Sequence, residues 1–126
     1  MACKLATIVQ KFLTVQIQIK TFHWQTFSYS KHKSADELFE QLIGLTDQFV
    51  ETFMGKQDRR LDFSKGISPK TIRLQNISYK KLLQILKQFD VFLIKLDGEC
   101  LSSDLLNIRD ELLGAVHRTQ YLLSLR

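Results

Sequence analysis

Residues 35–54 read ADELFEQLIGLTDQFVETFM, and this stretch decides the fold class. Apolar side chains recur in it every three or four positions, which is the spacing of one face of an α-helix. That face consists of Leu38, Phe39, Leu42, Leu45, Phe49 and Phe53. Ser34 stands three residues before Glu37, a pattern typical of a capping box at a helix start. With Gly55 as a stop signal, the stretch predicts a helix from Ala35 to Met54.

Three more stretches show the same helical spacing, and Gly and Pro are scarce in the chain. We expect helices over Leu5–Phe27 and Ser78–Leu96. A fourth helix is expected to begin after a cap at Ser102, Ser103 or Asp104. The three apolar stripes contain Leu5, Ile8, Val9, Phe12, Ile19 and His23; then Leu82, Leu86, Phe89, Leu93 and Leu96; then Leu105, Ile108, Leu112, Val116 and Leu123.

The connections between these helices differ in length. The polar stretch Ser28–Ser34 and the turn Asp97–Glu99 predict two short joins. From Gln57 to Asn76 the helical spacing fades, and this stretch predicts one long connection. Four amphipathic helices with two short joins and one long middle crossover are typical of a ferritin-like four-helix bundle. The whole chain, residues 1–126, is expected to form this single domain.

Composition narrows the class of protein. The net charge of +5 and the pI of about 9.3 indicate a mild basic excess. Two cysteines, Cys3 and Cys100, do not make a disulfide framework, and we expect reduced thiols in an intracellular, cytoplasmic protein. The chain has no run of about 18 apolar residues, so no membrane span is expected. The N-terminal stretch lacks the apolar core of a signal peptide.

Four side chains that can bind metal share one strip of the second predicted helix. At roughly 100° per residue, His32, Asp36, Asp47 and Glu51 project within about a quarter to a third of a turn of each other. Each pair, His32 with Asp36 and Asp47 with Glu51, has the i, i+4 spacing that lets two side chains meet one ion. The two pairs lie about 16 Å apart along a straight helix, so one helix cannot bring all four to one ion.

A two-fold axis would solve this difficulty. If a second copy of the helix crosses near Glu40–Gly44, the first pair of one chain faces the second pair of the other. Such an interface is isologous, which means that both chains contribute the same surface, and it therefore makes two equivalent sites. His23 lies on the apolar stripe of the first helix and could point into the same space. Imidazole and carboxylate ligands together suit iron or another divalent transition metal.

Plainer interpretations compete with a metal site. An acidic strip opposite an apolar face is usually solvated surface, and a histidine on an apolar stripe is usually a hydrogen-bonded core residue. Trp24 is most simply explained by packing. No Glu-x-x-His motif occurs, so a di-iron site within one chain is not expected. His117 falls off the stripe of the fourth helix and is expected at the surface.

Two motifs resemble the Dps group, the small DNA-protecting mini-ferritins. TFHWQ (21–25) resembles the His-Trp of that family's first helix. HKSADELFEQLIGLTDQFVE (32–51) resembles its second-helix signature of His, three residues, Asp, ten residues, Asp, three residues and Glu. The resemblance is to a short variant, and it carries the expectation of an origin in a large DNA virus, where the protein could be associated with the virion.

The resemblance implies a ferroxidase centre at a dimer interface. His23, His32 and Asp36 would come from one chain, and Asp47 and Glu51 from its two-fold mate. His23 would hold the tighter iron with Asp47 and Glu51, and His32 and Asp36 would hold the second. Trp24 would line the centre. The family oxidises Fe(II) with peroxide or oxygen and stores the ferric mineral in a twelve-chain shell, which protects against oxidative damage. The expected partner is therefore another copy of the chain, as a dimer at least.

Two alternative functions use the same fold. Basic residues gather in the predicted crossover and would bind DNA phosphates in a nucleic-acid-associated packaging protein. They are Lys56, Arg59, Arg60, Lys65, Lys70 and Arg73. A solvated face with a high pI would explain them equally. The other alternative is a metal-inactive oligomeric scaffold, such as a component of a viral particle.

Overall fold

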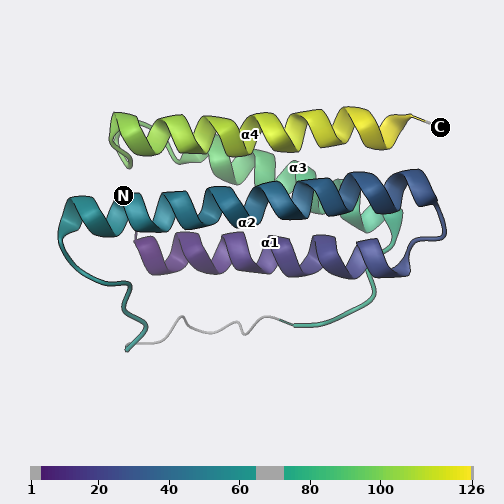
Figure 1. Cartoon of the computed structure of the whole chain (residues 1–126), viewed down its shortest axis with the longest axis horizontal. Coiled ribbons are helices and arrows are strands. Elements are labelled where there is room, and N and C mark those ends of the chain that lie inside the picture. The colour runs from purple at the N-terminus through teal and green to yellow at the C-terminus, as the bar shows by residue number, and fades with distance from the viewer. Residues whose placement is uncertain (1–3, 65–72, 126) are drawn as a thin grey trace.

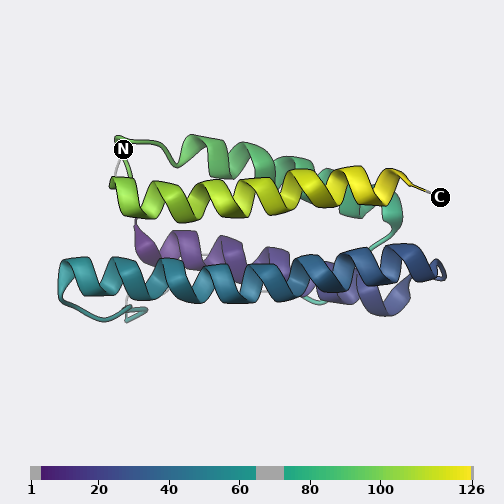
Figure 2. The ribbon, with the colours of Figure 1, turned by 45° about the horizontal axis from the view of Figure 1, so that its top comes forward.

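The computed structural model describes residues 4–64 and 73–125, and these residues form four helices with no strand among them. The helices are α1 (Leu5–Gln25), α2 (Tyr29–Gln57), α3 (Tyr79–Lys95) and α4 (Ser103–Ser124). They lie side by side in a bundle (Figures 1 and 2). α1 packs against α2 and α3, and α4 packs against the same two helices. The predicted all-helical class is confirmed.

The order of helix directions makes the middle connection long. α1 and α4 run one way along the bundle, and α2 and α3 run the other way (Figure 1). Because α2 and α3 are parallel, the chain leaves α2 at one end of the bundle and enters α3 at the other. The described parts of this connection are residues 58–64 and 73–78.

The core lies between the four helices and contains the predicted apolar stripes. Every stripe residue expected on α3 and α4 is buried, and so are Leu38, Leu42 and Phe49 of α2. Phe12 stands among aromatic neighbours, with its ring centroid 5.3 Å from that of Phe49 and 5.9 Å from that of Phe89, both edge to face. Such pairs contribute about 0.5–1.5 kcal/mol each beyond the burial of their area.

The boundaries of α1 and α2 differ from the prediction. α1 ends at Gln25 and α2 begins at Tyr29, so only three residues join them instead of the polar loop expected over Ser28–Ser34. The Ser28 hydroxyl, not that of Ser34, caps α2 and accepts a hydrogen bond from the backbone N–H of Lys31 at 3.3 Å. The capping box expected at Ser34 is therefore wrong, and His32 lies inside the helix.

The end of α2 was also predicted too early. The helix continues past Gly55 to Gln57. Asp58 ends it in the left-handed conformation, with a φ of 51°, and its backbone N–H donates to the Met54 carbonyl. Aspartate tolerates this conformation better than most residues, so Asp58 supplies the stop that was expected from Gly55.

The second half of the chain follows the prediction closely. Ser78 caps α3 by accepting a hydrogen bond from the Lys81 N–H at 3.1 Å. Ser102 precedes α4, but its hydroxyl donates to Asp104 instead of accepting from the helix. Cys100 is disulfide-bonded, so the expectation of a reduced thiol is wrong there, and Cys3 lies outside the described residues. In the parts described, no helix has the length and apolarity needed to cross a membrane.

Candidate metal site

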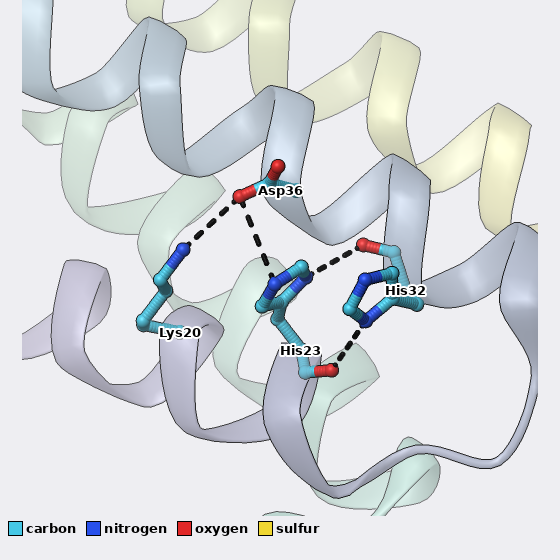
Figure 3. Close-up of polar contacts among 4 residues, drawn as sticks. All are labelled: Lys20, His23, His32 and Asp36. Atoms are coloured by element: carbon cyan, nitrogen blue, oxygen red, sulfur yellow. Dashed lines mark hydrogen bonds and ion pairs between the residues drawn. The ribbon is translucent and has the colours of Figure 1, made fainter.

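Two histidines hold the end of α1 against the start of α2. The rings of His23 and His32 are stacked, with centroids 3.7 Å apart and planes 19° from parallel. Nδ1 of His23 donates to the backbone carbonyl of His32 at 2.9 Å, and Nδ1 of His32 donates to the carbonyl of His23 at 2.8 Å (Figure 3). We call this arrangement the histidine clasp. The three-residue join between the helices is what brings the two residues together.

The clasp determines which ring nitrogen is free. A carbonyl oxygen can only accept a hydrogen bond, so each Nδ1 carries the hydrogen. In the neutral form of either ring, Nε2 then has an unprotonated lone pair. Metal-binding histidines usually donate their other N–H to a carbonyl or carboxylate, which fixes the ring in this way. Both imidazoles are thus in the tautomer that a metal ligand needs.

Asp36 stands one turn beyond His32 and completes the group. Its Oδ1 lies 3.8 Å from Nε2 of His23 and accepts a hydrogen bond from Nζ of Lys20 at 3.1 Å (Figure 3). That hydrogen bond is the main cause of a lowered pKa for the Asp36 carboxyl. Partial burial opposes this lowering, and positive charge on Lys20 and the two imidazoles adds to it. Asp36 is therefore held as a carboxylate.

The structure brings together three of the five predicted ligands. His23 is buried, and His32 and Asp36 are partly buried beside it. Asp47 and Glu51 lie exposed on α2, about 16 Å farther along the helix from the first pair. Across residues 4–64 and 73–125, no three His, Cys, Asp or Glu side chains are placed to hold a metal within one chain. The two pairs stay separate along α2, and their combination across two chains stays a prediction.

Sequence reasoning missed Lys20, and the lining role predicted for Trp24 concerns a centre between two chains and stays a prediction. Lys20 stands three residues before His23, so the two share a helix face, and this spacing was the available signal. Its ammonium lies 4.6 Å from the ring centroid of Phe39 and 5.8 Å from that of Trp24. The Trp24 side chain is exposed and does not line the group formed by the two histidines and Asp36 within the chain.

A second histidine–carboxylate pair joins α3 to α4. Asp90 is buried on α3, and its Oδ2 lies 3.0 Å from Nε2 of His117, whose side chain is 51% exposed. The expectation that His117 lies at the surface is confirmed in part, because the residue also supplies a hydrogen-bond partner to a buried carboxylate. Lys87 lies 3.9 Å from the same oxygen.

The basic residues predicted as one cluster are divided. Arg59 and Arg60 line a cavity of about 530 Å³ near Lys4, where α1 begins. Asn76, three residues after Arg73, accepts a hydrogen bond from Gln25, where α1 ends. The two positions are separated by the length of α1, about 30 Å, so their described members form no single patch. Lys65 and Lys70 lie outside the described residues.

Comparison with known proteins places the chain in a family. A family model matches residues 23–123, and its description is "Family of unknown function (DUF5856)". An uncharacterized 14.6 kDa protein from the mobD–ri intergenic region of Enterobacteria phage T4 is 27% identical over 113 residues, which cover 90% of this chain and 82% of the phage protein. No solved structure matches the chain. Because the family model matches well over half of the chain, including all of α2 and α3, the chain belongs to DUF5856, a family of unknown function.

Proposed function

We propose that this protein binds Fe(II) at sites shared between two copies of the chain and oxidises it with hydrogen peroxide or dioxygen, as a Dps-like ferroxidase. The observation that carries the proposal is the histidine clasp. Both Nδ1 hydrogens are used by backbone carbonyls, which leaves both Nε2 atoms for a metal, and Nε2 of His23 lies beside the carboxylate of Asp36. Such a pre-oriented pair of imidazoles, one buried and one partly buried, is more than core packing requires.

The second half of the proposed site is the pair Asp47 and Glu51. Both carboxylates are exposed and one helical turn apart, and in the described chain neither makes a hydrogen bond or ion pair. Gly44 lies between the two half-sites, and a Cβ added there would meet nothing within 4 Å. A second α2 could therefore approach closely at this position. The proposed crossing places the clasp of one chain opposite Asp47 and Glu51 of the other.

Iron is the substrate in this reaction. Two Fe(II) ions each give one electron to a hydrogen peroxide molecule, whose O–O bond breaks to yield two water molecules with the uptake of two protons. Two chains together supply three carboxylates and two imidazoles per site. Carboxylate charge favours the more highly charged ferric product by Coulomb attraction. Sequestration of ferric iron within a closed assembly of this chain is part of the proposal, as is a ferritin-like origin of the bundle.

In this proposal Lys20 competes with Fe(II) for the carboxylate of Asp36. Its ammonium bonds to Oδ1 of Asp36, the oxygen that lies 3.8 Å from Nε2 of His23, so in the proposed site Lys20 and Fe(II) compete for this atom. Binding of iron at Asp36 requires the lysine to move away. The flexible four-carbon side chain allows this movement, since Lys20 is partly exposed.

The test is aerobic addition of Fe(II) to the metal-free protein, with ferric absorbance followed over time. The proposal expects faster oxidation than in buffer, and a His23→Ala variant at the buffer rate. The His117→Ala variant is the matched control, because His117 belongs to the other histidine pair. Equal rates with and without the protein would contradict the proposal and favour the metal-inactive scaffold. The similarity to a phage protein is in keeping with the viral origin expected above.

A further inference from the structure

Three aromatic side chains stand exposed where α1 meets α2. Trp24 is 70% exposed, Phe27 is 106% exposed and Tyr29 is 74% exposed. We call these three residues the aromatic tip. A group of large apolar side chains on the surface typically marks an interaction site. Phe27 is fully solvated, so it contributes nothing to the packing of the core, and its presence at this position needs another reason.

The aromatic tip has a small hollow. A cavity of about 250 Å³ is lined by Thr26, Phe27, Ser28, Tyr29 and His32. This volume is below the roughly 300–1,000 Å³ of sites for drug-sized ligands. Tyr29 stacks on His32, with ring centroids 6.1 Å apart and planes 23° from parallel, and His32 stacks in turn on His23. Tyr29 is thus the outer member of a stack of three rings.

Positive charge surrounds the aromatic tip. Nζ of Lys33 lies 5.9 Å from the ring centroid of Tyr29, and Nζ of Lys20 lies 5.8 Å from that of Trp24. Nζ of Lys31 lies 4.7 Å from the ring centroid of Tyr79, which begins α3. These contacts place positive charge next to the exposed rings, and this charge attracts anions.

The start of α3 adds to this charge. Gln25 bonds to Asn76 and to the backbone N–H of Ile77, each at 2.8 Å, and these bonds hold the end of the crossover against the tip. The neighbouring residues 73–83 include Arg73, Lys80 and Lys81 and contain no acid. In residues 18–37 the acids are Asp36, which is paired with Lys20, and Glu37. This end of the bundle is therefore basic.

The charge decides which occupant the tip would accept. A second copy docked tip to tip would bring lysines against lysines, so the tip disfavours itself as a partner. A polyanion with flat groups satisfies both the rings and the charge. We propose that the aromatic tip binds single-stranded nucleic acid, with bases stacked on Phe27 and Tyr29 and phosphates on Lys31 and Lys33. Stacking on aromatic rings beside a basic groove is the common way of binding single strands.

The single tryptophan makes the proposal testable. Trp24 is the only Trp in the sequence and lies in the tip, so its fluorescence reports on this surface alone. We expect short oligo(dT) to quench it when added to the full chain in a chelator, without iron. The affinity should fall linearly with salt on logarithmic axes. Absence of quenching, together with absence of a gel shift, overturns the proposal.

Matched variants separate stacking from charge. Phe27→Ser should weaken binding about five- to 150-fold, and it should not affect folding because the side chain is solvated. Phe63→Ser is its control, since Phe63 is exposed after the far end of α2. Lys33→Ala should reduce the salt slope by about 0.7, and Lys95→Ala, at the end of α3, should leave it unchanged.

Three results would overturn the assignment of the partner. The first is equal affinity for oligo(dT) and for dextran sulfate, because stacking on the aromatic rings would then contribute nothing to binding. The second is equal affinity for a duplex of the same length, in which the bases are already stacked. The third is quenching by vesicles rich in phosphatidylglycerol without quenching by oligo(dT), which would make the tip a membrane contact.

Discussion

The two histidine–aspartate pairs of the bundle illustrate two different uses of the same side chains. Nε2 of His117 lies 3.0 Å from buried Asp90, and this pair satisfies itself. Nε2 of His23 stays 3.8 Å from Asp36, while Lys20 makes the shorter contact with that carboxylate. The backbone carbonyls take the Nδ1 hydrogens in the second case. A self-satisfied pair stabilises the fold, whereas a pair held slightly open can receive a cation.

The largest effect is expected on Fe(II) affinity, which should depend on His23 and not on His117. His23→Ala removes a proposed ligand and should lower Fe(II) affinity by more than about 100-fold, because loss of an outer partner alone costs about 10- to 100-fold. Calorimetric titration under anaerobic conditions measures this affinity. His117→Ala should titrate like the parent protein. The comparison fails if both variants, or neither, lose iron binding.

For the stability of the fold, we expect the His117–Asp90 pair to matter more than the His23–Asp36 pair. His117→Ala leaves the buried Asp90 carboxylate without its nearest partner, and we expect a loss of about 1–3 kcal/mol in the free energy of unfolding. Asp36→Asn should cost less than about 1 kcal/mol, since the Asp36 side chain is 44% exposed and its ion pair is screened by solvent. Urea unfolding followed by circular dichroism gives both values. A larger loss for Asp36→Asn would show that the Lys20–Asp36 pair is structural.

A smaller effect is expected from removing Lys20, which contacts Asp36 in the His23–Asp36 pair. Lys20→Met should raise the pKa of Asp36 back toward its ordinary value of 3.8, because the hydrogen bond that lowers it is gone. A lowered pKa in the folded state contributes stability that is present above the ordinary value and is lost as the pH falls through the lowered one. In the variant this contribution should be largely absent, because the folded-state pKa then lies close to the ordinary value. Carboxyl NMR titration of Asp36 measures the shift.

The same variant bears on iron. Without the ammonium, Fe(II) no longer competes for Asp36, and its affinity at neutral pH should rise by up to about fivefold, the worth of one partly exposed ion pair. An unchanged or lower affinity would mean that iron does not use Asp36.

The smallest expected effects come from two glycines of α2. A Cβ added at Gly44 or at Gly55 meets nothing within 4 Å, so each Gly→Ala change should stabilise the single chain by up to about 1 kcal/mol. Only Gly44→Ala should weaken self-association, since the proposed crossing lies at Gly44. Sedimentation equilibrium distinguishes the two variants, and equal association would move the crossing elsewhere on the helix.

Much of the fold follows from local patterns. The predicted stripe residues of α3 and α4 are all buried, because every one is an aliphatic or aromatic side chain at helical spacing. The start of α2 was not predicted correctly, since Ser28 and Ser34 are both plausible caps. The choice of Ser28 depends on the stacking of His32 against His23, which is a contact between helices.

The candidate site was predictable only where it follows one helix. A helical wheel shows that four of the predicted ligands share one strip of α2: His32, Asp36, Asp47 and Glu51. The contact between Lys20 and Asp36 joins residues 16 positions apart on different helices, and it depends on a turn shorter than the one expected. The disulfide bond of Cys100 likewise depends on a contact that spacing in the sequence does not reveal.

Mixing two inactive variants shows whether two chains contribute unlike halves of each iron site. Chains carrying His23→Ala keep Asp47 and Glu51, and chains carrying both Asp47→Ala and Glu51→Ala keep the clasp. After joint refolding, half of the dimers are mixed and each has one complete site, so about a quarter of the parent's oxidation rate should return. A mixture of His23→Ala with His32→Ala is the control and should stay inactive. A first mixture that co-assembles and remains as inactive as the control would contradict the account.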